Sequence, residues 1–269
     1  MKIDDSLRNE VMPEMVYSLC RLVASRRLSQ KEIVRALALG ADNEKKIRDS
    51  VNKVFNFAQK SGMIRKNEES EIWECLFRDD ELLSFRSFRH ALFMKAAPNE
   101  NVRFGKIVQW YLSQDPELLR IEKAEALIQN LPEDILMKDA QNARGFIIWA
   151  CALGVMQRGY AGAKNRAMNI YPKIDGCISD WLYYEKPFQK GERVLVRDFM
   201  QQMRSDCPLL KDTFAGNDIN RVLSNALRIL DGTGWIRLRY TKDSGDVWHL
   251  TRSITRQMTN DVTEIEVLR

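Results

Sequence analysis

The chain has 269 residues, of which 45% are hydrophobic, and a formal net charge of +5 from 42 basic and 37 acidic residues. The hydrophobic content is ordinary for a globular protein and excludes a wholly disordered chain, and the length suits one to three domains. The small excess of positive charge is by itself only a weak indication of an anionic partner.

The first module is predicted over residues 8–78. Apolar residues at helical spacing from about Val11 predict two helices, and Ser29 with Glu32 forms a capping box at the start of the second. The stretch DNEKKIRDSVNKVFNFAQKSG predicts a long third helix, and MIRKNEESEIWECLF predicts a strand, a polar turn and a second strand. The outward face of the third helix carries cations suited to phosphate contact: Lys45, Lys46, Arg48 and Lys53. The neighbouring Glu44 and Asp49 leave an ordinary solvated face as the alternative.

A connecting helix is predicted over residues 79–101, and its acidic start favours a helix N-terminus over a nuclease centre. Residues 102–174 are predicted as a middle helical, winged-helix-like domain, in which VMQR and RAMNIY flank the loop GYAGAKN as a basic wing. A helical linker with an irregular extension is the alternative. Residues 140–174 contain no acid, and their candidate phosphate contacts are Arg144, Arg158, Lys164 and Arg166.

A linker is predicted over 175–190, a C-terminal winged helix over 191–257 and a tail over 258–269. The amphipathic stretch NDINRVLSNALRILDGTG predicts a helix, followed by a hairpin in which WIRLRY pairs with VWHLT. The predicted outward face of the helix carries Asn220, Arg221, Ser224, Asn225 and Arg228, and the hairpin carries Arg237, Arg239 and Lys242. Arg and Asn suit base edges, but flanking acids keep protein contact open, and packing of the hairpin arginines along Trp235 is a structural alternative.

Three similar stretches, SGMIRK, LGVMQR and TGWIRL, each follow a predicted helix. A glycine at such a position takes the left-handed conformation that ends a helix, and the apolar residues after it begin a strand. The repetition therefore predicts three helix-to-hairpin junctions at Gly62, Gly154 and Gly234.

The first and third modules resemble the winged helix-turn-helix superfamily. The stretches VNKVFNFAQKSGMIRKNEESEIWECL and INRVLSNALRILDGTGWIRLRYTKDSGDVWHLT carry the resemblance, and the overall layout also resembles winged-helix proteins of bacterial defence islands such as DpdG. The fold class predicted is mainly α with short β-hairpins, as three tandem winged-helix modules joined by helices. The resemblance implies DNA binding by the third helix in the major groove, although many superfamily members bind only protein.

The sequence contains no HExxH, CxxC, P-loop or GxSxG motif, and its five cysteines are widely spaced and odd in number. We therefore expect no enzyme activity, metal or cofactor, and thiols in a reducing cytoplasm. The charged N-terminus and the short apolar stretch GFIIWACALGVM predict a cytoplasmic protein with no membrane partner.

Our hypothesis is a DNA-binding component of an antiviral defence or DNA-processing complex. Its expected partners are duplex DNA and other protein subunits, and a homodimer is compatible with the sequence. A protein-interaction scaffold that docks partner subunits without touching DNA is one alternative. A transcriptional regulator is the other.

Overall fold

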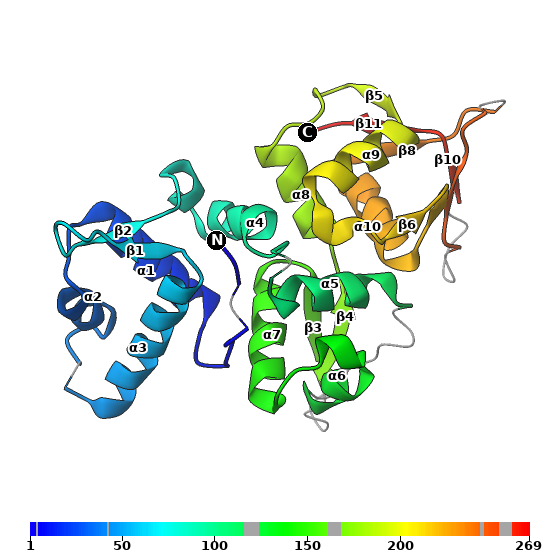
Figure 1. The fold of residues 1–269 in the computed structure, drawn as a ribbon. Coiled ribbons are helices and arrows are strands. Elements are labelled where there is room, and N and C mark those ends of the chain that lie inside the picture. The colour runs from blue at the N-terminus through cyan, green and yellow to red at the C-terminus, as the bar shows by residue number, and fades with distance from the viewer. Residues whose placement is uncertain are drawn as a thin grey trace. The chain divides into compact units, whose positions relative to one another are not determined.

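The computed structural model describes residues 1–3, 5–41, 43–99, 101–115, 124–160, 168–242, 245–252 and 260–269. The fold is mainly α with short strands in small sheets, as predicted (Figure 1). The chain divides into two compact units. Unit 1 comprises Met1–Lys106 and Ala124–Leu153, and unit 2 comprises Ile107–Lys123 and Gly154–Arg269. The stretch predicted as a middle domain therefore contributes to both units.

Unit 1 begins with three helices and a hairpin, in the order predicted (Figure 1). The capping box of Ser29 and Glu32 is present at the start of the second helix. Val34 and Val51 pack together in the core between the second and third helices. The two strands pair antiparallel, as expected. The order of three helices followed by a hairpin matches that of a winged helix-turn-helix. Assignment to that superfamily stays a prediction. The elements are α1 (Pro13–Ser25), α2 (Gln30–Leu37), α3 (Lys45–Lys60), β1 (Ile64–Lys66) and β2 (Trp73–Cys75).

Unit 1 continues through a short 3-10 turn and four further helical segments. These are η1 (Asp80–Leu82), α4 (Phe85–Lys95), α6 (Ala124–Asn130), η2 (Glu133–Ile135) and α7 (Ala140–Ala152). The segment before α1 crosses α7 at Gly145, where an added Cβ would lie 2.8 Å from the backbone nitrogen of Arg8. Trp149 is fully buried and donates its ring N–H to the carbonyl of Val11 at 2.7 Å. Glycine at this crossing therefore lets the N-terminal segment lie against α7.

Unit 2 contains the second hairpin and a helix at the predicted linker. Helix α5 (Arg103–Ser113) crosses from unit 1 into unit 2. Strands β3 (Met156–Tyr160) and β4 (Met168–Pro172) pair antiparallel, which confirms the predicted hairpin; its loop lies outside the described residues. Residues 175–190 are not a plain linker, because α8 (Asp175–Tyr184) buries Trp181 completely and packs on the amphipathic helix that follows later in the chain.

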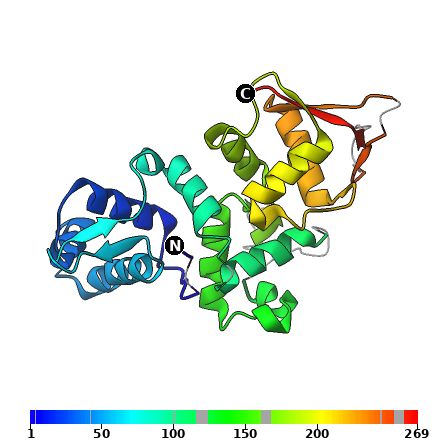
Figure 2. The same cartoon turned by 45° about the horizontal axis from the view of Figure 1, so that its top comes forward.

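The C-terminal part of unit 2 differs from the predicted hairpin. Strand β8 (Ile236–Arg239) pairs with β11 (Glu264–Val267), whereas β9 (Trp248–Leu250) lies in another sheet. Figure 2 shows β11 in red beside its neighbours. The prediction that β8 pairs with β9 is therefore wrong, and residues 258–269 are not a tail. The other elements are β5 (Arg193–Leu195), α9 (Val196–Asp206), η3 (Pro208–Leu210), β6 (Phe214–Ala215), β7 (Asp218–Ile219), α10 (Arg221–Gly232) and β10 (Asp261–Val262).

The pairing of β11 has a simple physical cause. Its residues alternate between charged and apolar, so Ile265 and Val267 are buried while Glu264 and Glu266 lie on the other face. Ile265 lies opposite Leu238 of β8 and also opposite Val194 of β5. A central strand with this register buries apolar side chains from both neighbours, which a β8–β9 hairpin alone would leave partly exposed.

The three helix-ending glycines have the backbone conformation that the sequence predicted. The φ angles of Gly62, Gly154 and Gly234 are 65°, 79° and 71°, in the left-handed region. Each lies two residues after the last residue of α3, α7 or α10. An L-residue at these positions would be strained, so the glycines set where each helix turns into a strand.

Candidate nucleic-acid interface

Exposed cations gather at the beginning of α3 in unit 1. Lys45, Lys46 and Arg48 are exposed, and none has an ion pair or side-chain hydrogen bond within the described part of the chain. Ile47 and Val51 of the same helix pack with Val34 in the hydrophobic core. This packing leaves the cations on the outward side of the helix. Cations on an exposed helix end, not already neutralised, are what phosphate contact requires.

The fourth cation predicted on this face has a structural partner. Lys53 is half-buried, and its Nζ lies 2.7 Å from Oε1 of Glu10. The hydrogen bond from Lys53 lowers the pKa of Glu10, although partial burial opposes the shift. Lys53 therefore attaches the segment before α1 to α3 and is less available to a ligand than its neighbours.

Further cations beside this face were not singled out from the sequence. Lys31 and Arg35 lie one turn apart on the exposed side of α2, which packs on α3. Arg26 and Arg27 are exposed after α1, and all four side chains lack a partner among the described residues. The i, i+4 spacing of Lys31 and Arg35, on the side of the helix opposite the buried Ile33, was the signal that could have identified the α2 pair.

Acidic residues only partly balance this group of cations. The carboxylate of Glu32 accepts hydrogen bonds from the backbone and hydroxyl of Ser29, so its role is to cap α2. Glu44 and Asp49 are exposed at the same end of α3 as the lysines and weaken the positive potential there. We use the term cationic face for seven exposed cations on or near α1–α3 that have no ion pair in the described part of the chain: Arg26, Arg27, Lys31, Arg35, Lys45, Lys46 and Arg48.

Two amides extend the outward row of α3 beyond its cations. Arg48, Asn52 and Asn56 follow one another at i, i+4 and i+8, which places them on one side of the helix. Asn56 is exposed and Asn52 is half-buried. Guanidinium and amide groups in such a row have the donors and acceptors that read guanine and adenine edges.

The hairpin next to α3 has no excess of positive charge, because Arg65 and Lys66 are outnumbered by Glu68, Glu69, Glu71 and Glu74. Arg65 lies 3.2 Å from Glu74, and Lys66 lies 2.8 Å from Glu71. A hollow of about 690 Å³ lies beside this hairpin and the end of α1, and its lining includes Arg26, Arg27, Asn67, Trp73 and Cys75. The positive charge of this part of unit 1 therefore comes from the cationic face and not from β1 and β2.

The predicted recognition face of α10 is largely used for folding. Asn220 caps the helix by accepting from the backbone N–H of Leu223 at 3.0 Å, and its amide donates to the carbonyl of Leu112 at 2.9 Å. The prediction that Ser224 faces outward is wrong, since it is 0% exposed and donates to the carbonyl of Ile219. Asn225 is exposed.

The two arginines of α10 also have partners inside unit 2. Arg221 is half-buried, and its Nη1 lies 3.5 Å from Oδ1 of Asp115. Arg228 is half-buried and donates to the side chain of Asn260 at 3.3 Å. The predicted outward residues Asn220, Arg221 and Arg228 of α10 therefore make contacts within unit 2.

The arginines of β8 lie opposite acids supplied by β11. The register places Arg237 opposite Glu266 and Arg239 opposite Glu264, and Arg239 forms an ion pair with Glu266. The hydrogen bond from Arg239 lowers the pKa of the Glu266 carboxyl. Trp235 is covered by Arg269, whose guanidinium carbon lies 5.5 Å from the ring centroid.

The remaining predicted contacts divide into three cases. Arg144 is exposed on α7 and paired with Glu125 at 3.0 Å. Arg158 is half-buried on β3, and Lys242 is exposed after β8. Lys164 and Arg166 lie outside the described residues. Whether any of these cations contacts DNA stays a prediction.

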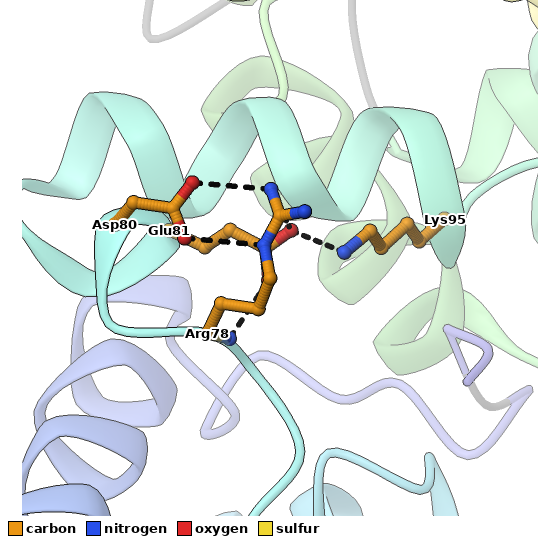
Figure 3. Close-up of polar contacts among 4 residues, drawn as sticks. All are labelled: Arg78, Asp80, Glu81 and Lys95. Atoms are coloured by element: carbon orange, nitrogen blue, oxygen red, sulfur yellow. Dashed lines mark hydrogen bonds and ion pairs between the residues drawn. The ribbon is translucent and has the colours of Figure 1, made fainter.

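The acidic run after β2 is a structural network (Figure 3). Glu81 is 6% exposed; its carboxylate accepts from the backbone N–H of Arg78 at 2.9 Å and forms ion pairs with Arg78 and Lys95. Arg78 also donates two hydrogen bonds to Asp80, each of 3.1 Å. These contacts connect the segment after β2 to the end of α4 and neutralise the carboxylates of Asp80 and Glu81.

The described part of the chain contains no group of three or more His, Cys, Asp or Glu side chains placed to hold a metal ion. Among the same residues, no helix combines the length and apolar character needed to cross a bilayer.

A family model described as DpdG-like matches residues 7–244. The chain belongs to the DpdG-like family. The match supports the resemblance to DpdG and associates the chain with the defence context of that resemblance. No curated protein and no solved structure matches this DpdG-like chain.

Proposed function

We propose that this DpdG-like protein is a DNA-binding component of a defence or DNA-processing complex and that it contacts duplex DNA through the cationic face. The observation that carries the proposal is the exposed group Lys45, Lys46 and Arg48, which has no neutralising partner in the described part of unit 1. Lys31 and Arg35 are further exposed cations on α2, which packs on α3.

Side-chain chemistry indicates which residues contact phosphates and which contact bases. Lys45 and Lys46 are compact charges that contact phosphate oxygens without reading sequence. Arg48, Asn52 and Asn56 lie along α3 and point toward base edges when the helix enters the major groove. The protein therefore has strong non-specific affinity with a smaller contribution from sequence.

Salt dependence tests the electrostatic part directly. Neutralising about five phosphates makes log affinity fall with log salt at a slope of about −4 to −5. The measurement is fluorescence anisotropy of the full chain with a labelled random duplex across a salt series. A slope near zero, or no binding at low salt, would overturn the proposal.

A charge-reversal variant locates the surface. The triple variant Lys45→Glu, Lys46→Glu and Arg48→Glu is expected to lose about 100-fold or more in affinity at physiological salt, and its slope becomes shallower by about 3. The matched control is Lys190→Glu, Lys211→Glu and Arg252→Glu, three exposed cations of unit 2 with the same change in charge. Equal losses in both variants would mean that net charge alone, and not the cationic face, governs binding.

A protein partner is the second candidate, and it is favoured by the sheet of unit 2. Leu195 and Tyr240 are 42% and 51% exposed beside the balanced charges of Arg239 and Glu266. Mixed apolar and paired charged groups suit a protein surface better than a phosphate backbone. Binding of partner subunits that survives the α3 reversal but is lost in Leu195→Asp would assign this sheet to a protein partner.

A further inference from the structure

Two thiols meet in unit 1 between a core helix and a hairpin strand. Cys20 lies on α1 and is 0% exposed, and Cys75 is the last residue of β2 and is half-buried. Helix α1 packs directly on β2, and the Cys20 and Cys75 side chains lie close enough to influence each other's ionisation. They are not joined by a disulfide. The pair is therefore already in contact in the reduced protein.

The surroundings give the two sulfurs different roles. The hydrogen bond that Cys20 donates to Cys75 raises the pKa of Cys20, and burial raises it further, so this thiol stays protonated. The same bond lowers the pKa of Cys75, and the backbone N–H groups of Leu76 and Phe77 add to the effect, against partial burial and the charge of Glu81. Cys75 is consequently the sulfur that more readily becomes a thiolate.

Cys75 is also the member of the pair that a reagent can reach. It lines the hollow of about 690 Å³ between the end of α1 and the hairpin, together with polar groups of Ser25, Arg26 and Asn67. Cys177 and Cys207 are buried, and burial raises the pKa of Cys207 strongly. Cys151 is half-buried on α7 and does not line this hollow.

We propose that Cys75 is an oxidation site and that Cys20 is its resolving thiol, so that peroxide joins α1 to β2 through a disulfide. The Cys75 thiolate attacks one oxygen of hydrogen peroxide, and the O–O bond breaks to leave a sulfenic acid and hydroxide, which takes a proton to become water. The Cys20 sulfur then attacks the Cys75 sulfur, its proton goes to the departing hydroxyl, and a second water leaves. This inference does not depend on DNA binding.

Peptide mapping tests the product. The reduced full chain is treated with hydrogen peroxide, alkylated, and digested with trypsin without reduction. The expected product joins residues 9–21, which contain Cys20, to residues 67–78, which contain Cys75, with the loss of two hydrogen atoms. A disulfide between Cys75 residues of two chains, or oxidation of Cys151 ahead of Cys75, would overturn the proposal.

Three variants separate the roles. In Cys20→Ala, the sulfenic acid at Cys75 persists and is trapped by dimedone, whereas in Cys75→Ser no oxidation is expected at Cys20. Cys151→Ser is the matched control and leaves the yield of the internal disulfide unchanged. Failure to trap an adduct at Cys75 in Cys20→Ala would count against the assigned order.

A measurement on the unaltered chain keeps the inference testable if the buried substitution at Cys20 prevents folding. Limited alkylation of the native protein with iodoacetamide is expected to label Cys75 several-fold faster than Cys151, with Cys20 slower than both. Faster labelling of Cys151 than of Cys75 would remove the basis for the site.

Discussion

Unit 1 and unit 2 both present arginines and lysines on elements that the sequence predicted to contact DNA, but the two sets differ in their partners. On α3 of unit 1, Lys45, Lys46 and Arg48 lack partners in the described residues. On β8 of unit 2, Arg237 and Arg239 lie opposite the acids of β11. The comparison teaches that the number of cations on an element says less than what the fold places across from them.

The largest change is expected in DNA affinity, when an arginine of α3 is compared with an arginine of α10. This comparison tests whether α3, and not α10, contacts bases. Arg48→Ala is expected to cost about 1–3 kcal/mol in affinity for a selected preferred site and to relax preference at one base pair. Arg221→Ala, at a position held near Asp115, leaves both the affinity and the preference nearly unchanged. The measurement is binding to a randomised duplex pool followed by titration of single sites. The opposite ranking of the two variants would reverse the comparison between units.

The next effect concerns the stability of α10. Asn220→Ala removes the helix cap and is expected to lower the free energy of unfolding by about 1 kcal/mol, while Asn225→Ala, at an exposed position, changes it by less than about 0.5 kcal/mol. Urea unfolding of both variants measures the difference. Asn220→Asp retains the capping oxygen but loses the hydrogen bond to the Leu112 carbonyl, so it separates these two contributions. If Asn220→Ala instead weakened DNA binding with stability intact, Asn220 would be a contact residue.

A smaller change in DNA affinity is expected when the acids of β11 that offset the β8 arginines are removed. The double variant Glu264→Gln and Glu266→Gln removes the acids opposite Arg237 and Arg239. Affinity for random duplex is expected to rise a few-fold and the salt slope to steepen by about 1, because Arg239 is released from its ion pair and the charge of Arg237 is no longer offset by nearby acids. Anisotropy at low and physiological salt measures both quantities. Unchanged binding would mean that this face cannot approach DNA even when its charge is exposed.

The smallest effect is the pH dependence of the Arg239–Glu266 pair. The pKa of Glu266 is lowered in the folded chain, chiefly by its hydrogen bond from Arg239, so the pair stabilises the fold above the unfolded pKa near 4.5. This contribution is lost as the pH falls through the lowered folded pKa. The free energies of unfolding of the wild type and Glu266→Gln are therefore expected to differ at pH 6 and to converge as the pH falls below the lowered folded pKa of Glu266. A difference that grows with acidity would contradict the assigned sign.

Local patterns in the sequence were sufficient for several elements. The capping box at Ser29, the apolar face of α3 and the polar turn after Lys66 each depend on neighbours within a few residues, and each is present in the structure. The hairpin of β3 and β4 was predicted in the same way. Short-range patterns suffice here because helix caps, helix faces and tight turns are determined by residues close in sequence.

Long-range pairing was where the sequence analysis went wrong. The sequence predicts one hairpin from the stretches that contain β8 and β9, and a tail over residues that include the alternating strand Glu264–Val267. In the structure, β8 and β9 belong to different sheets. The choice of partner for β8 depends on which strand best covers its apolar face, and β11 does so through Ile265 and Val267. The misassignment of α8 as a linker had the same origin, because its burial arises from contact with α10.

The candidate site divides along the same line. Local sequence patterns correctly predicted that α3 is an amphipathic helix with Lys45, Lys46 and Arg48 outward, and that Gly62, Gly154 and Gly234 end their helices. Only the tertiary structure decided which cations keep their charge available, because ion pairs such as Lys53–Glu10 and Arg239–Glu266 join residues 43 and 27 positions apart. Helical periodicity and glycine conformation are local properties of the chain, whereas neutralisation of a charge depends on what folding brings within a few ångströms of it.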